Sequence, residues 1–150
     1  MSDLKLQIGE DTKSAMKARD KQRVATLRMV NAEIKRIEVD ERRELSDDDV
    51  ISILNTMLKQ RKDSLQQYQE ASRQDLADQE AYEIDVISSF MPQPLTDEEL
   101  TREIDACVQE VGAQGMQDMG KVMGVLKGKV HGRADMGKVS QLVKASLQSL

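Results

Sequence analysis

Glycine and lysine recur together late in the chain, in a pattern suited to contacting phosphate. Residues 112–137 hold seven of the eight glycines. On a helix that turns by roughly 100° per residue, three of them fall on one face with a lysine on each side. The three glycines and two lysines are Gly120, Gly124, Gly128, Lys121 and Lys127. Two interpretations of this face follow from the cost of glycine in a helix.

Each helical glycine costs about 1 kcal/mol relative to alanine, so three at one spacing require a compensating benefit. The usual benefit is close approach of another backbone. That backbone is either a neighbouring helix or a phosphate chain held between the lysines. Residue chemistry alone does not choose between them.

Charge is unevenly distributed along the second half of the chain. Residues 95–118 carry seven acids against one base, a net −6, whereas residues 119–150 carry six bases against one acid, a net +5. Local charge governs what docks on a surface, even though the whole chain has a net charge of −5. We therefore expect the nucleic-acid contacts to come from Lys121, Lys127, Lys129, His131, Arg133 and Lys138, with Gly120, Gly124, Gly128 and Gly132 permitting close approach.

A second basic cluster lies near the N-terminus. Six cations are opposed there only by Asp20: Lys13, Lys17, Arg19, Lys21, Arg23 and Arg28. The simpler interpretation is a solvated helix face, and the alternative is a binding patch.

No combination of residues predicts a catalytic, metal or cofactor site. Cys107 lies on an apolar stripe, which predicts a core thiol. His131 is the only histidine, so a zinc cluster has no ligand set and a nucleophile has no histidine base. Residues 115–121 match the spacing of a phosphate-binding loop, but Val122 replaces the hydroxyl that holds magnesium, and no strand precedes it.

The composition predicts an all-α protein. Of the 150 residues 33% are charged and only three are aromatic, and no segment alternates apolar and polar residues with period two. Such a chain has no exposed aromatic platform for bases, so any nucleic acid should be bound by its folded backbone. A single cysteine indicates a reducing cytoplasm, and no apolar run is long enough for a membrane span.

Helical periodicity predicts two domains, residues 1–92 with about four helices and residues 95–150 with three. The boundary is set by Pro92 and Pro94, because a proline disfavours helical geometry in the residue before it. In the first helix we expect four residues to face inward: Leu4, Ile8, Ala15 and Met16. Capping residues are expected at Ser46, Asp75, Thr96 and Asp135, and the glycine-rich helix is expected to begin near Gln117 and to end at Gly132.

Several segments together resemble one known family, the stand-alone GatB/YqeY-like proteins. The segments are Leu27-Arg28-Met-Val-Asn31-Ala-Glu-Ile34-Lys35, Lys59-Gln-Arg-Lys62, Arg73-Gln-Asp75-Leu76, Met91-Pro92-Gln, Gly120-Lys-Val-Met-Gly124 and Gly132-Arg133-Ala134-Asp135. The part after Pro94 also resembles the tail of the B subunit of the glutamine-dependent aspartyl/glutamyl-tRNA amidotransferase. That resemblance implies a helical appendage that contacts tRNA, whereas the amide-forming chemistry of that enzyme lies in a separate catalytic domain.

Three functions are compatible with these observations. The leading hypothesis is a non-catalytic accessory protein that binds tRNA or another folded RNA. The second is a module in which the glycine face receives a helix of a protein partner, for example one in translation. The third, implied by the family resemblance, is carbon–nitrogen ligase activity with glutamine as amide donor.

Overall fold

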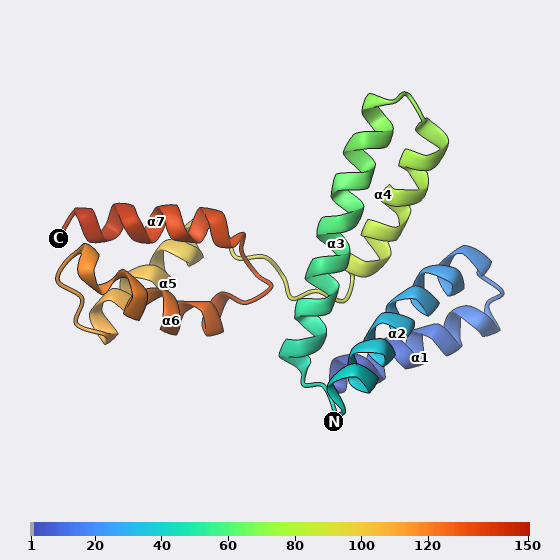
Figure 1. The fold of residues 1–150 in the computed structure, drawn as a ribbon, viewed down its shortest axis with the longest axis horizontal. Helices are drawn as coiled ribbons and strands as arrows, with labels where there is room; N and C mark the ends of the chain where they lie inside the picture. Colours follow the sequence, from blue (N-terminus) through green and yellow to red (C-terminus); the bar gives the residue numbers. More distant parts are fainter. Residues whose placement is uncertain (1) are drawn as a thin grey trace. The chain divides into compact units, whose positions relative to one another are not determined.

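The computed structural model describes residues 2–150, and its regular structure is helical throughout, which confirms the predicted all-α class (Figure 1). The chain divides into two compact units, Met1–Met91 (the N-terminal unit) and Pro92–Leu150 (the tail unit). The N-terminal unit contains α1 (Asp3–Lys17), α2 (Lys21–Glu41), α3 (Asp47–Glu70) and α4 (Gln74–Ser88). The tail unit contains α5 (Asp97–Glu110), a 3-10 turn η1 (Met116–Asp118), α6 (Met119–Val130) and α7 (Met136–Gln148).

The N-terminal unit is built around one apolar cluster to which all four helices contribute. Ile8 of α1, Leu27 of α2, Leu54 of α3 and Ile87 of α4 are each inaccessible to solvent. The longest helix, α3, packs along α4 and also contacts α1 and α2. Burial of these side chains at about 1.5–3 kcal/mol each is the main force holding the four helices together.

The first helix, α1, buries two of the residues expected to face inward but exposes a third. Ser2 caps α1 by accepting a hydrogen bond from the Lys5 amide, and its hydroxyl also donates to the Asp47 carboxylate of α3. Ile8 and Ala15 are buried, as expected. The inward prediction for Met16 is wrong, because its side chain is 51% exposed. At roughly 100° per residue Met16 lies a full step from Ala15, beyond the edge of the buried stripe.

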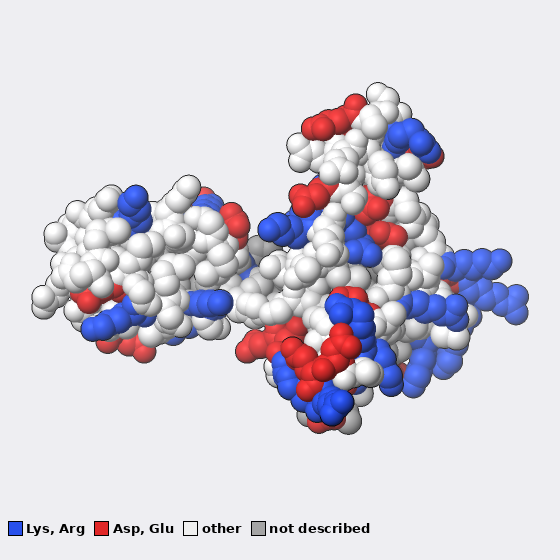
Figure 2. All heavy atoms as spheres, in the orientation of Figure 1, with Lys and Arg blue, Asp and Glu red and all other residues white. Residues whose placement is uncertain are grey.

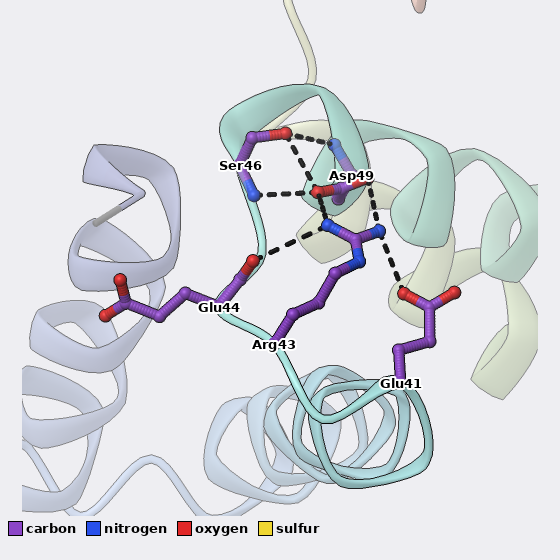
Figure 3. Close-up of polar contacts among 5 residues, drawn as sticks. All are labelled: Glu41, Arg43, Glu44, Ser46 and Asp49. Atoms are coloured by element: carbon purple, nitrogen blue, oxygen red, sulfur yellow. Dashed lines mark hydrogen bonds and ion pairs between the residues drawn. The ribbon is translucent and has the colours of Figure 1, made fainter.

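The junction between α2 and α3 is held by a compact set of polar contacts (Figure 3). Ser46 and Asp49 form the capping box expected of this sequence, each side chain bonding the other residue's amide. Arg43 then donates two hydrogen bonds to the Asp49 carboxylate, at 2.7 and 3.1 Å, and pairs with Glu41 at 2.8 Å. The hydrogen bonds from Arg43, followed by those from the backbone and side chain of Ser46, hold the pKa of Asp49 well below its ordinary value.

This lowered pKa makes the N-terminal unit sensitive to acid. A carboxylate whose pKa is lower in the folded state stabilises the fold above its unfolded pKa, near 4, and loses that contribution as the pH falls through the folded pKa. Asp49→Asn should cost about 1 kcal/mol at pH 7 and should flatten the loss of stability below pH 4. Urea unfolding at several pH values measures both effects. Asp63→Asn, at an exposed position of α3, is the matched control, and an equal flattening in that variant would contradict the assignment.

The start of α4 differs from the expected cap. The predicted capping role of Asp75 is wrong: α4 begins at Gln74, its N-cap residue is Arg73, and no side-chain hydrogen bond caps it. Asp75 lies in the first turn, where its carboxylate accepts hydrogen bonds from the Arg73 guanidinium at 3.2 and 3.3 Å. The Asp75 carboxylate still stabilises α4, because its negative charge lies near the positive N-terminal end of the helix dipole.

The tail unit has its own core, formed by one face of each of its three helices. Cys107 of α5, Val122 and Leu126 of α6 and Val143 of α7 are inaccessible to solvent. Thr96 and Asp135 cap α5 and α7 through their side chains, as predicted. The helix that carries the glycines begins at Met119, two residues later than Gln117, because residues 116–118 form a 3-10 turn.

Candidate nucleic-acid interface

The glycine face of α6, defined by Gly120, Gly124 and Gly128, is open to solvent. All three residues are exposed, and a Cβ atom built on any of them would meet no atom of another element within 4 Å. The apolar face of the same helix, carrying Val122, Leu126 and Val130, is buried in the tail core. No described part of the tail unit therefore packs against the glycine face, so its glycines give no packing benefit within that unit.

Two lysines flank this face. At roughly 100° per residue, Lys127 lies about 20° before Gly120 around the helix, and Lys121 lies about 20° beyond Gly128. Lys121 is 73% exposed and its ammonium is 3.9 Å from the Asp118 carboxylate, which is a loose pair. Lys127 is exposed and has no carboxylate partner among residues 2–150. Both ammonium groups can therefore reach an anion that lies over the glycines.

Two other predicted cations turn toward carboxylates of α5. Lys129 lies on α6 about 160° from Lys127, and its ammonium is 2.9 Å from the carboxylate of Glu110. The hydrogen bond from Lys129 to Glu110 raises the pKa of that lysine. Lys138, in the first turn of α7, donates to the Asp97 carboxylate. A phosphate that binds either lysine would compete with these carboxylates for the ammonium group.

The remaining predicted contacts lie in the turn that follows α6. The Arg133 amide donates to the Val130 carbonyl at 2.9 Å, and the turn places His131 at φ −53°, ψ 123° and Gly132 at φ 72°. These angles match a type II turn, which requires a positive φ at its third residue and therefore favours glycine there. Gly132 thus ends α6, as expected.

Arg133 bonds the backbone of the segment that precedes α5. Its Nε donates to the Gln93 carbonyl at 3.0 Å, and its own carbonyl accepts from the Leu95 amide at 2.9 Å. These bonds tie the segment before α5 to the turn after α6.

The structure thus divides the six predicted contacts into separate groups. Lys121 and Lys127 lie beside the glycine face, Lys129 and Lys138 pair with α5, and His131 and Arg133 lie in the turn. Figure 2 shows acidic and basic side chains interspersed on the visible face of the tail unit. Local sequence gives no sign of the pairing carboxylates, because Glu110 and Asp97 lie 19 and 41 residues from their lysines. Only Asp118, three residues before Lys121, gives a local signal.

The one cysteine of the chain has the environment of a core residue. The Cys107 side chain has no exposed surface, and burial raises the pKa of its thiol. Residues 2–150 contain no group of three or more His, Cys, Asp or Glu side chains placed to hold a metal ion. Across the same described range, every helix is too short or too polar to span a bilayer.

The fold is that of a small all-helical protein with two compact units. Comparison with known families shows to which family it belongs. The model of the Yqey-like protein family matches residues 5–147, nearly the whole chain. The chain belongs to the YqeY-like family, as the sequence resemblance indicated.

Curated relatives include three fungal proteins with the same name, "Altered inheritance of mitochondria protein 41, mitochondrial". The protein from Pyrenophora tritici-repentis is 26% identical over 83% of this chain and 69% of its own length. The protein from Kluyveromyces lactis is 33% identical over 69% of this chain and 56% of its own length, and that from Lachancea thermotolerans is 32% identical over 69% and 55%. The chain therefore matches little more than half the length of the latter two.

Proposed function

We propose that this protein is a non-catalytic accessory protein that binds tRNA or another folded RNA through α6 of the tail unit. One observation carries the proposal: the glycine face of α6 is open to solvent and lies between Lys121 and Lys127. The family resemblance to the tRNA-contacting tail of the amidotransferase supports it. The proposal includes a cytoplasmic location, because the chain has a single cysteine.

The energetics of α6 favour an external ligand over internal packing. Gly124, in the middle of α6, costs about 1 kcal/mol relative to alanine, and Gly120 and Gly128, in the first and last turns, add to that cost. Within the tail unit nothing packs against Gly124 or its two neighbours on this face to offset that cost. A phosphate backbone that approaches the bare helix would contact the Lys121 and Lys127 ammonium groups at the same time. Such contacts are electrostatic and independent of sequence.

A helix of a protein partner is the second candidate, and a specific observation favours it. Lys129 and Lys138 are paired with carboxylates, which leaves less free positive charge around α6 than the sequence indicates. A small-residue face receives a partner helix closely without any need for charge. The third candidate, amide transfer from glutamine, is supported by the family resemblance alone.

Substitutions on α6 separate the first two candidates. In the RNA proposal, Lys121→Gln with Lys127→Gln should flatten the slope of log affinity against log salt by about 2, because each phosphate contact contributes about 0.9. Gly124→Leu should weaken binding at every salt concentration by holding the backbone away from the helix. Titration with unfractionated tRNA at several salt concentrations measures both.

Gly124→Ala and the lysine variant provide the controls. Gly124→Ala should stabilise α6 by about 1 kcal/mol. If Gly124→Ala loses less affinity for tRNA than Gly124→Leu, the size of the leucine side chain, and not unfolding, causes the loss. If Gly124→Leu abolishes a protein complex that the lysine variant leaves intact, the partner-helix interpretation is correct. If wild-type protein has no salt-dependent affinity for tRNA near physiological ionic strength, the RNA proposal is wrong.

A further inference from the structure

The turn between α1 and α2 gathers cations at one end of the N-terminal unit. Helix α1 ends at Lys17 and α2 begins at Lys21, and the two helices pack against each other. The turn between them places Arg19 in the left-handed region, at φ 57°. Figure 2 shows basic side chains projecting into solvent at this end, at the right of the view. We call this surface the basic hairpin end: Lys13, Lys17, Arg19, Lys21 and Arg28.

Most of these cations lack an acidic partner. Lys17, Arg19, Lys21 and Arg28 are exposed, and none of them forms an ion pair with a carboxylate in the part of the chain that the structure describes. Lys13 makes only a long contact of 3.6 Å with Glu10, in which both side chains are at least 70% exposed. This surface therefore differs from the tail unit, where three of the predicted lysines have carboxylates nearby.

The nearby acids are already occupied by other contacts. Asp20 caps α2 by accepting a hydrogen bond from the Arg23 amide at 3.2 Å. Asp11 lies 3.8 Å from the Arg23 guanidinium. Both acids line an open hollow of about 280 Å³ between the two helices, together with Ala15 and Ala18. Asp11 thus lies beside the Arg23 guanidinium and Asp20 caps the α2 N-terminus, and neither carboxylate forms an ion pair with Lys17, Arg19 or Lys21.

Helix geometry directs these cations away from the core. On α1, Lys13 and Lys17 lie roughly 140–180° around the helix from Ile8, which is buried. On α2, Lys21 and Arg28 are seven residues apart and so share one face, about 10 Å apart along the axis at 1.5 Å per residue. The surface therefore presents separated positive charges instead of one compact anion pocket.

We propose that the basic hairpin end is a second RNA contact, which binds the phosphate backbone of the folded RNA. This inference rests on the function proposed above. A chain of spaced phosphates matches spaced cations, and neutralising them releases condensed counterions. An anionic membrane fits less well, because the apolar stripe of α1, with Ile8 and Ala15, is already buried in the core. Only two large apolar side chains next to these cations in sequence are exposed, Met16 at 51% and Met29 at 37%.

The test compares two triple variants of the full chain that lose the same charge. The first removes three cations of the basic hairpin end: Lys17→Gln, Arg19→Gln and Lys21→Gln. The control removes three exposed cations elsewhere in the N-terminal unit that have no ion pair in the described chain: Arg42→Gln, Lys59→Gln and Lys62→Gln. Affinity for unfractionated tRNA is measured at several salt concentrations, and circular dichroism verifies that each variant is folded.

We expect the hairpin variant to weaken tRNA binding on the order of tenfold or more and to flatten the salt slope by about 2 to 3, while the control stays near wild type. If both variants lose affinity for tRNA equally, the loss reflects the change in net charge alone, and the inference is overturned. Unchanged binding in the hairpin variant would also overturn it, while loss of binding in the Lys121/Lys127 variant would still support the proposed function. If wild type does not bind tRNA, both proposals fail. Binding to phosphatidylserine vesicles but not to tRNA would assign the surface to membranes.

Discussion

Replacing Arg61 with alanine is expected to lower the free energy of unfolding of the N-terminal unit by about 3 kcal/mol. Arg61 of α3 pairs with Glu83 of α4 at 3.2 Å, and the two side chains are only 15% and 11% exposed. The guanidinium also donates to the Met57 carbonyl at 3.2 Å. Removing it leaves the Glu83 carboxylate buried without a cation, and the desolvation of that charge is the source of the cost. Urea unfolding at pH 7 measures the change.

A double variant separates the ion pair from packing. Arg61→Met combined with Glu83→Leu removes both charges and keeps similar volume, so we expect its stability to lie within about 1 kcal/mol of wild type. Glu83→Leu alone should be costly for the converse reason, because it leaves the largely buried Arg61 guanidinium without its carboxylate partner. If the double variant is as unstable as Arg61→Ala, packing and not the unpaired charge determines the loss.

This ion pair also illustrates what the sequence could not predict. The polar run from Lys59 to Lys62 interrupts the apolar period of α3. In the structure Lys59 and Lys62 are exposed, but Arg61 turns inward to a residue 22 positions away. Such a pairing has no local signature, because it depends on how two helices come together.

Features set by neighbouring residues were predicted more successfully. Ser46 and Thr96 cap helices because their hydroxyls reach an amide three residues on, so sequence spacing alone decides the contact. The capping prediction for Asp75 failed because an aspartate is also favourable within the first turn of a helix, where Asp75 is the second residue of α4. At the candidate interface, helical spacing places the three glycines on one face, but the exposure of that face and the pairing of Lys129 and Lys138 depend on how the tail helices pack.

Leu126→Ala is expected to destabilise the tail unit by about 3 kcal/mol while leaving the N-terminal unit unchanged. Leu126 has no exposed surface and lies in the tail core, which shares no residue with the core of the N-terminal unit. Truncating a buried leucine removes its transfer free energy and leaves a cavity, at a cost of about 2.7–5 kcal/mol. A domain of about 60 residues has little stability in reserve, so this loss should populate unfolded tail at room temperature.

Amide hydrogen exchange resolved by residue measures this effect, because it reports each unit separately. In Leu126→Ala, protection should fall throughout α5, α6 and α7 and stay at the wild-type level in α1 to α4. Val125→Ala, at the partly exposed neighbouring position, is the control and should change protection far less. An equal loss of protection in both units would show that they unfold as one body. The same variant tests the two RNA contacts, because unfolding the tail removes the glycine face. Residual salt-dependent binding to tRNA that is then lost when Lys17, Arg19 and Lys21 are also replaced comes from the basic hairpin end.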